Sequence, residues 1–187
     1  FDLDEPSIDQ ARINADHAQL DGRVQFHARH ASDLSTPGTY DLVTAFECIH
    51  DMADPVGALR AMREMAGEMG SVVIMDERTA ERFSPQESGL DGLFYGFSVL
   101  ACLPTGMDEQ PSAQTGTVMR PETLKKYALA AEFKEMVVLP IEYFFIGFIG
   151  FGKWRSSSHR CTTSDTTSKK SKKQAKTNNC LYKGISL

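Results

Sequence analysis

Several residues with acid, base or thiol side chains follow directly on an apolar run at residues 42–46, LVTAF. They are Glu47, Cys48, His50, Asp51 and Asp54. Carboxylates and an imidazole at this spacing suit general acid–base chemistry on a bound molecule. The apolar run is short, partly β-branched and bounded by turn residues, which is typical of a buried strand. A buried strand that ends in polar residues is where open α/β sheets bind their ligands.

A second acidic pair, Asp76 and Glu77, follows another apolar run at residues 71–75, SVVIM. The segment between the two runs, residues 55–69, has apolar side chains at helical spacing and begins with a proline, which the first turn of a helix tolerates. Glycines at positions 67 and 70 end that helix. Strand, acidic corner, helix and strand make one βαβ unit with polar groups at its carboxyl edge.

The rest of the chain supplies the elements that position these groups. Asp4 is suited to cap the first helix, because its side chain accepts a backbone hydrogen bond there. Two strands separated by a short turn at Pro140 must run antiparallel, so the sheet ends in a hairpin. The predicted elements are a strand end at 1–3, a helix over 6–20, a short strand over 24–27, a helix over 86–102 within an insert spanning 77–119, a helix over 121–131, and strands over 135–139 and 141–151.

The composition fits one ordinary α/β domain of 187 residues, of which 41% are hydrophobic. No run approaches the roughly 18 apolar residues of a membrane span, and no secretory signal is visible. The four cysteines show no CxxC spacing, so they indicate ordinary thiols in a reducing compartment rather than a metal site or disulfides. We therefore expect a cytoplasmic protein with no bound metal and no membrane contact.

Charge divides the chain into two regions. Residues 153–187 carry 9 of the 20 Lys and Arg residues but 1 of the 25 Asp and Glu residues. This tail is rich in Ser, Thr and Lys, which predicts disorder. We expect a folded domain over residues 1–151 and a basic tail over residues 152–187. The Lys-rich run at 169–173 suits a nuclear-import signal or nucleic-acid contact, but the acidic domain opposes binding to nucleic acid.

The order of elements and four of the motifs resemble a class I S-adenosylmethionine-dependent methyltransferase of the small-molecule type, related to members fused to a winged helix. FDLDEPSIDQAR resembles the second strand and its acidic corner. YDLVTAFECIHDMADP resembles the fourth strand, and GSVVIMDE the fifth. TGTVMRPETLKKYALAAEF with KEMVVLPIE resembles the last helix and the closing hairpin. The resemblance covers about residues 1–145.

The resemblance implies a Rossmann-like sheet of strand order 3-2-1-4-5-7-6 that lacks its first strand, its first helix and its glycine-rich loop. The missing strand would lie between residues 1–3 and residues 42–46, leaving two sheet edges without a neighbour, which is unfavourable. The expectation is therefore a fragment of a longer enzyme. A short, degenerate protein is the alternative.

The resemblance also implies which residues bind the cofactor. Asp2 matches the acid that accepts both ribose hydroxyls, and Leu3 would pack on the adenine. The alternative for Asp2 is a charge favoured by the helix dipole, although Asp4 and Glu5 fit that role better.

The family places an acid after its third strand to bind the adenine amino group, and here His30 stands at that place, followed by Ala31. A neutral imidazole accepts such a hydrogen bond more weakly than a carboxylate, so Asp33 is a possible substitute. Phe46 is expected to border the methionine part of the cofactor. A solvent-exposed loop histidine and a core phenylalanine are the alternatives.

Methyl transfer to an oxygen or nitrogen acceptor is helped by a nearby base. His50 and Glu47 are the candidates, with Asp51 orienting His50. A histidine with no role at a helix start is the alternative. The insert is expected to supply either a wall for an organic acceptor or a simple extension of the core. The wall would consist of Phe94, Tyr95, Phe97, Cys102 and Met107.

Three other functions compete with methyl transfer to a small organic acceptor. A nicotinamide dehydrogenase also uses an acid after its second strand, but the chain has no GxGxxG. A catalytically inactive binding or regulatory module agrees with the missing glycine loop and with His30. Nucleic-acid binding rests on the tail alone. The acceptor and the oligomeric state are not indicated by the sequence.

Overall fold

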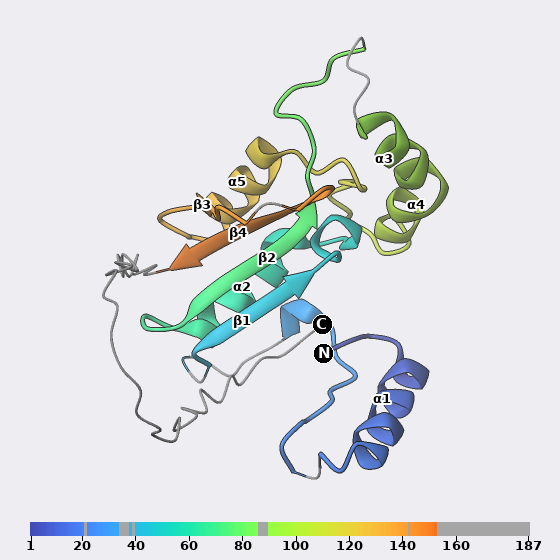
Figure 1. Ribbon diagram of the computed structural model, residues 1–187, viewed down its shortest axis with the longest axis vertical. Helices are drawn as coiled ribbons and strands as arrows, with labels where there is room; N and C mark the ends of the chain where they lie inside the picture. Colours follow the sequence, from blue (N-terminus) through green and yellow to red (C-terminus); the bar gives the residue numbers. More distant parts are fainter. Residues whose placement is uncertain (21, 34–37, 39, 86–89, 142, 153–187) are drawn as a thin grey trace, which may run out of the picture.

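The computed structural model describes residues 1–20, 22–33, 38, 40–85, 90–141 and 143–152. Its centre is a mixed four-stranded sheet in the order β1-β2-β4-β3 (Figure 1). β1 and β2 are parallel, whereas β4 is antiparallel to both β2 and β3. This is the expected α/β sheet with a closing antiparallel hairpin. The strands are β1 (Leu42–Phe46), β2 (Ser71–Glu77), β3 (Val137–Val138) and β4 (Ile146–Gly152).

Two helices, α2 and α5, lie behind the sheet in Figure 1 and cover one face. α3 and α4 lie beyond the carboxyl ends of β1 and β2, and α1 stands apart on the β1 side. The helices are α1 (Glu5–His17), α2 (Pro55–Ala66), α3 (Asp91–Phe97), α4 (Leu103–Gly106) and α5 (Pro121–Ala130). Short 3₁₀ turns are η1 (Ala31–Asp33) and η2 (Ile49–Asp51), and η3 (Ser98–Cys102) is a π-helical turn.

The core follows the apolar patterns of the βαβ unit. Burial alternates along β2, so Val72 and Ile74 face the core, where Leu59 of α2 is fully buried. Asp54 caps α2 by accepting a hydrogen bond from the Gly57 amide at 2.8 Å. Parallel register between β1 and β2 brings their carboxyl ends to one edge. The predicted polar corner is thereby assembled from both strands.

Several element predictions need correction. The strands expected at residues 1–3 and 24–27 reduce to a single parallel bridge between Asp2 and Ala28. The helix predicted to reach residue 69 ends at Ala66, because Gly67 adopts a φ of 59°. The hairpin strands are shorter than predicted, with β4 beginning at Ile146. Asp4 caps α1 as expected, accepting from the Ser7 amide at 2.9 Å.

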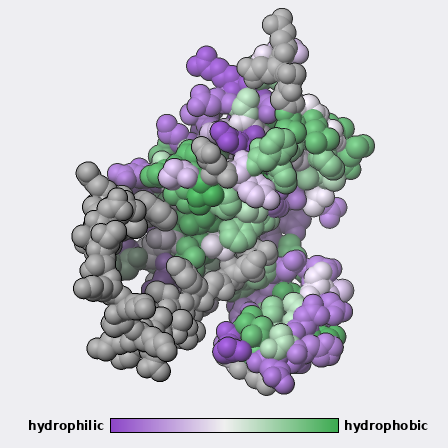
Figure 2. Space-filling view, viewed as in Figure 1, coloured by the Kyte–Doolittle hydropathy of each residue, from purple (hydrophilic) through white to green (hydrophobic). Residues whose placement is uncertain are grey.

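The insert differs most from its prediction. Helical structure runs from α3 through η3 into α4 instead of ending at residue 102. Of the apolar residues at helical spacing in this segment, Phe94 is buried, whereas Leu93, Phe97 and Leu100 are 56%, 55% and 83% exposed. Figure 2 shows this apolar surface in green over α3 and α4. Helical periodicity located the apolar side chains, but it did not indicate that most of them would remain exposed.

β1 is an edge strand: among the described residues its only strand neighbour is β2. This agrees with the expectation of an open edge beside residues 42–46. No helix in the described part of the chain is long and apolar enough to cross a membrane. The predicted basic tail, including its Lys-rich run at 169–173, lies outside the described residues.

Candidate functional site

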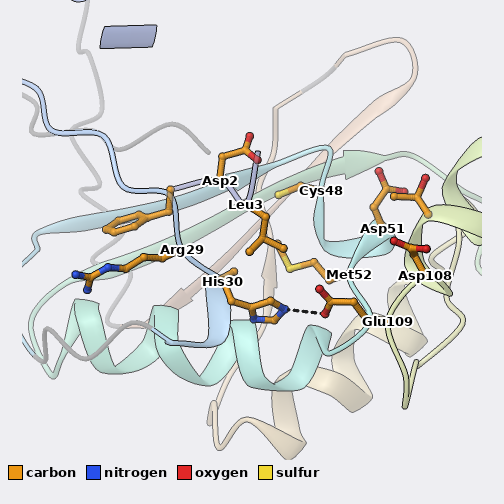
Figure 3. A pocket seen from close by; sticks show the side chains of 13 residues that line it. Asp2, Leu3, Arg29, His30, Cys48, Asp51, Met52, Asp108 and Glu109 are labelled. Carbon is orange, nitrogen blue, oxygen red and sulfur yellow. Dashed lines mark hydrogen bonds and ion pairs between the residues drawn. The ribbon is translucent and has the colours of Figure 1, made fainter. Parts of the chain in front are cut away.

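A cavity of about 330 Å³ opens at the carboxyl edge of β1 (Figure 3). Its position agrees with the prediction that ligands bind where the strands end. The lining residues come from the first three residues, the segment before η1, the segment around η2, and the insert. They are Phe1, Asp2, Leu3, Arg29, His30, Ala31, Cys48, Asp51, Met52, Ala53, Thr105, Asp108 and Glu109.

Four of the five predicted cofactor residues line this cavity: Asp2, Leu3, His30 and Ala31. Backbone hydrogen bonds bring them together. The Asp2 amide donates to the His27 carbonyl at 3.1 Å, and the Arg29 amide donates to the Asp2 carbonyl at 2.8 Å. The single bridge between these segments therefore places Asp2 beside His30, although neither segment forms a regular strand.

Asp2 and Leu3 present free groups to the cavity. One carboxylate oxygen of Asp2, Oδ1, accepts from the Asp4 amide at 3.0 Å. The other oxygen has no hydrogen bond to a described residue, so it is available to hydroxyl groups of a ligand. Leu3 is 58% exposed and offers an apolar surface for a flat ring.

His30 is held between two partners. Its Nδ1 lies 2.6 Å from Ser32 Oγ, and its Nε2 lies 3.2 Å from Glu109 Oε2 (Figure 3). Glu109 comes from the insert, 79 positions along the chain. It adds a carboxylate beside His30, the residue that stands where the family pattern has an acid. Asp33, which the sequence suggested for this purpose, does not line the cavity.

The cavity wall contains two acids that sequence reasoning missed, Asp108 and Glu109, which enter from the turn after α4. Asp51, which the sequence suggested as the partner of His50, also lines the cavity and enters from η2. Among the described residues, Arg29 is the only Lys or Arg in the lining, and its guanidinium points away from the carboxylates in Figure 3. No spacing rule links residues 2, 30, 51 and 109, so only the fold reveals that they share one wall.

Phe46 and Glu47 lie outside the lining of this cavity, and their predicted roles stay predictions. Glu47 adopts a φ of 53°, which non-glycine residues rarely take, and its amide donates to the Met75 carbonyl at 2.9 Å. Burial, with the charge of Glu77, raises the pKa of Glu47 to about 7. Glu47, the polar residue that follows β1, therefore lies against the end of β2.

His50 forms the centre of a second polar cluster, behind the cavity. Its Nδ1 lies 2.8 Å from Asp76 Oδ1 and 3.3 Å from Glu77 Oε2, and its Nε2 lies 3.1 Å from Asp51 Oδ1. The His50 and Asp76 side chains are 3% and 4% exposed. Burial alone lowers the pKa of His50, but hydrogen bonds that its ring donates to Asp51 and Asp76, together with the charges of Asp76 and Glu77, outweigh burial and raise that pKa to about 12.

Neighbouring groups respond to the same crowding. Burial, followed by hydrogen bonding to Asp76 and the charge on Asp76, raises the pKa of Glu77 to about 7. Burial, followed by the charge of Asp76, raises the pKa of the Cys48 thiol to about 11. A thiol with so high a pKa is a poor nucleophile at neutral pH. Cys48 therefore contributes a soft wall to the cavity rather than reactive chemistry.

The insert is tied to the site, but not through the residues expected to form an acceptor wall. The Gly116 amide donates to the His50 carbonyl at 3.1 Å, and the Ala113 amide donates to the Ala53 carbonyl at 2.8 Å. Cys102 lies near His50 and Asp51. None of the predicted wall residues lines the cavity; these are Phe94, Tyr95, Phe97, Cys102 and Met107. The wall from the insert consists of Thr105, Asp108 and Glu109 instead.

Comparison with known proteins decides the family. The sequence profile described as "Methyltransferase domain" matches residues 1–115, which is more than half of the chain and includes every predicted site residue. The chain belongs to the methyltransferase-domain family. Members of this family use S-adenosylmethionine, as the sequence predicted. No curated protein matches the sequence.

Solved structures agree on the fold. The apo S-adenosylmethionine-dependent methyltransferase SibL has a TM-score of 0.56 and 19% identity over 81% of this chain. The O-methyltransferase NcsB1, solved with S-adenosylmethionine and 2-hydroxy-5-methyl naphthoic acid, has a TM-score of 0.53 and 18% identity over 78%. A methyltransferase from Aquifex aeolicus has a TM-score of 0.51 and 14% identity over 80%. The methyltransferase domain spans 42%, 38% and 65% of these chains, so about half the length of the structures it matches.

The cavity of this methyltransferase domain fits part of the cofactor. The free carboxylate oxygen of Asp2 suits a ribose diol, and exposed Leu3 suits the flat adenine. Four carboxylates line the wall (Asp2, Asp51, Asp108 and Glu109) against one arginine, which favours a cationic ligand such as a sulfonium. A volume of about 330 Å³ lies at the small end of ligand cavities, so it suits a nucleoside better than the whole cofactor.

Proposed function

We propose that the cavity binds the adenosine part of S-adenosylmethionine and that the enzyme containing this domain transfers the methyl group of that cofactor to a small organic acceptor. The observation that carries the proposal is the convergence of Asp2, Leu3, His30 and Ala31 on one cavity at the carboxyl edge of β1. These residues were selected from the sequence by their match to cofactor positions. Their assembly from two separate segments supports the cofactor assignment.

In this proposal each lining group has a role toward the cofactor. Asp2 accepts hydrogen bonds from the ribose hydroxyls through its free oxygen, and Leu3 packs against the adenine. His30, held by Glu109 at 3.2 Å, faces the adenine edge with Ala31 beside it. Phe46 borders the methionine part from the end of β1. Removing polar partners of this kind typically weakens binding, because the ligand groups then lose their hydrogen bonds.

The cofactor supplies an electrophilic methyl group on a sulfonium sulfur. The protein has to align the acceptor with it and exclude water. Glu47 is our candidate for receiving the acceptor's proton, because it directly follows β1. Both ring nitrogens of His50 face carboxylates and its side chain is 3% exposed, so we assign His50 to positioning the η2 segment instead of proton transfer.

A small organic acceptor agrees with the naphthoic acid bound to NcsB1, a relative in fold only. We also propose that the active enzyme is longer than this chain, in keeping with the share of its structural relatives that the chain spans and with the open edge of β1. The free thiols of Cys48 and Cys102 accord with a cytoplasmic location. An inactive, cofactor-binding module is the second candidate, favoured by the histidine at position 30.

The test is calorimetric titration of the full chain with S-adenosylhomocysteine. Asp2→Asn keeps the size of the side chain and removes its charge. The matched control is Asp9→Asn, because Asp9 is an exposed acid on α1 whose partner is Arg12. We expect the Asp2 variant to bind about 10-fold to 100-fold more weakly, which corresponds to a charged hydrogen bond of about 1.5–3 kcal/mol. The Asp9 variant should bind as the unmodified chain does.

If the Asp2 and Asp9 variants bound S-adenosylhomocysteine equally well, Asp2 would not be a cofactor-binding residue. Absence of binding by a chain that circular dichroism shows to be folded would contradict the cofactor proposal for this chain. Binding without methyl transfer to any phenol, carboxylic acid or amine tested would favour the inactive module. Measuring the far-ultraviolet spectrum of every variant separates loss of binding from loss of fold.

A further inference from the structure

The buried cluster around His50 has the composition of a metal site. His50, Asp76 and Glu77 each offer one ligand atom, and these atoms lie within 4.8 Å of one another. Two of the distances are 2.8 Å, from Nδ1 to Asp76 Oδ1, and 3.3 Å, from Nδ1 to Glu77 Oε2. In a metal site each ligand atom lies about 2.0–2.2 Å from the ion. The separations between such ligand atoms are then similar to the two distances measured here.

A second observation concerns Asp76, whose side chain is 4% exposed. Its Oδ2 has no hydrogen-bond partner in the part of the chain that the structure describes, although its Oδ1 faces His50. A buried carboxylate oxygen without a partner is costly. Among the described residues, no Lys or Arg forms an ion pair with Asp76, Glu77 or Asp51; their cationic partner is His50. The cluster therefore has more negative than positive groups.

We propose that His50, Asp76 and Glu77 bind a divalent transition-metal ion, with Zn²⁺ as the representative. The ligands would be the His50 Nδ1 and one oxygen from each carboxylate. Imidazole nitrogen combined with carboxylate oxygen suits Zn²⁺ better than Mg²⁺, which prefers oxygen ligands and retains its waters. Binding replaces the proton on Nδ1, which is released to solvent.

The surroundings of the imidazole support this orientation. Asp51 Oδ1 lies 3.1 Å from Nε2, on the side of the ring away from Asp76. Metal-bound histidines commonly donate their other N–H to a carboxylate, which fixes the ring and the tautomer. Asp51 would take that part while Nδ1 faces the ion. Asp76 and Glu77 extend from β2, whose pairing with both β1 and β4 holds them in place.

A competing trio consists of His50, Asp51 and Cys102. It is less suitable because the Asp51 side chain is 33% exposed and Cys102 ends the π-helical turn of the insert. The two trios share His50, but Asp76 lies at its Nδ1 and Asp51 at its Nε2. A single metal ion bound to one ring nitrogen therefore belongs to one trio only. A variant that removes Cys102 therefore distinguishes them.

The test is titration of the metal-free full chain with ZnCl₂, followed by calorimetry and by competition with a chromogenic chelator. The informative variant is Glu77→Gln, because the Glu77 side chain, at 12% exposed, is the least buried of the three ligands. We expect it to lose at least about 10-fold in affinity, because it removes a ligand and because altering even a carboxylate that only supports a ligand costs about 10-fold to 100-fold. Cys102→Ser is the matched control and should bind Zn²⁺ unchanged. All other cysteines and histidines remain in both variants.

Co²⁺ provides a readout that does not depend on variants. A bound Co²⁺ ion with nitrogen and oxygen ligands should give visible absorption without a thiolate-to-metal charge-transfer band. Unchanged affinity in Glu77→Gln, a loss in Cys102→Ser, a thiolate band that Cys102→Ser removes, or no Zn²⁺ binding by the folded chain would each overturn the proposal. None of these measurements requires S-adenosylmethionine, so the result is independent of the proposed methyl transfer.

Discussion

Two histidines at the same edge of the sheet each pair with a glutamate or aspartate, yet their environments differ sharply. His30 and Glu109 lie 3.2 Å apart with side chains 27% and 56% exposed, in the wall of the cavity. His50 and Asp76 lie 2.8 Å apart with side chains 3% and 4% exposed, between the ends of β1 and β2. The residue types are alike, so the difference comes from burial.

Burial decides what each pair does for the protein. In the exposed pair, water competes for both side chains, so the pair adds little stability and both side chains remain available to a ligand. In the buried pair, each group depends on the other, and removing one leaves an uncompensated charge. The first region is therefore suited to binding and the second to holding the corner of the sheet together.

The largest expected effect tests that division. Asp76→Ala should lower the free energy of unfolding by about 3 kcal/mol, the lower end for breaking a buried ion pair, because Asp51 and Glu77 remain beside the ring. Urea denaturation with a chelator present measures it without any contribution from bound metal. Glu109→Ala is the control and should change stability by less than about 1 kcal/mol. Similar losses for the two variants would break the comparison.

Cysteine alkylation provides the next test, since Cys48 lines the cavity and Cys102 does not. Because its high pKa makes Cys48 slow to react at neutral pH, the alkylation is run at about pH 9. There, S-adenosylhomocysteine at ten times its dissociation constant should slow the reaction of Cys48 with iodoacetamide about tenfold. Cys102 should react at the same rate with and without ligand. Peptide mapping by mass spectrometry reports both rates in one sample. Equal protection would indicate a general tightening of the domain instead of occupancy of the cavity.

A smaller effect is expected at Glu109. Glu109→Gln keeps the size of the side chain but removes the charge that faces His30 and the cavity. A single hydrogen bond contributes about 0.5–1.5 kcal/mol of free energy. Its loss should weaken the binding of S-adenosylhomocysteine about 2-fold to 10-fold. Calorimetry at two salt concentrations checks it, because an electrostatic contribution shrinks as salt rises. Tighter binding by this variant would mean that Glu109 opposes the ligand.

The comparison also separates what the sequence predicts from what it does not. The βαβ unit was predictable, because apolar runs, a proline at the start of α2 and glycines at its end all indicate the same elements. Asp2 and His30 were identified through their match to family motifs, and the structure places them together in the cavity. These features depend on short-range patterns.

Other features depend on contacts between distant segments, which periodicity does not contain. Glu109 joins His30 across 79 positions, and nothing in the local sequence of the insert marks it. The exposure of Leu100 at 83% was likewise not indicated, because helical spacing groups apolar side chains without saying what covers them. The strand expected at residues 24–27 does not form, and the only bridge beside it in the described part of the chain joins Ala28 to Asp2.

The smallest expected effect concerns His27, whose carbonyl accepts from the Asp2 amide and whose ring stacks on Phe1 at 4.9 Å. Burial, followed by the positive charges of Arg29 and Arg12, lowers the pKa of His27. Folding therefore disfavours the imidazolium, so the contribution of neutral His27 to stability is complete above the unfolded pKa of about 6.5 and is lost as pH falls through the lowered folded value.

Nuclear magnetic resonance titration of the His27 ring protons should give a midpoint below about 6.5. His27→Phe keeps a ring against Phe1 and removes the titration. Binding of S-adenosylhomocysteine to the unmodified chain should weaken slightly between pH 7.5 and pH 5.5, whereas binding to this variant should weaken less. A midpoint above the unfolded value would reverse the sign, because protonation would then strengthen the segment that positions Asp2. In that case the region around the cavity, and not the buried cluster around His50, would be the one that becomes more stable as pH falls.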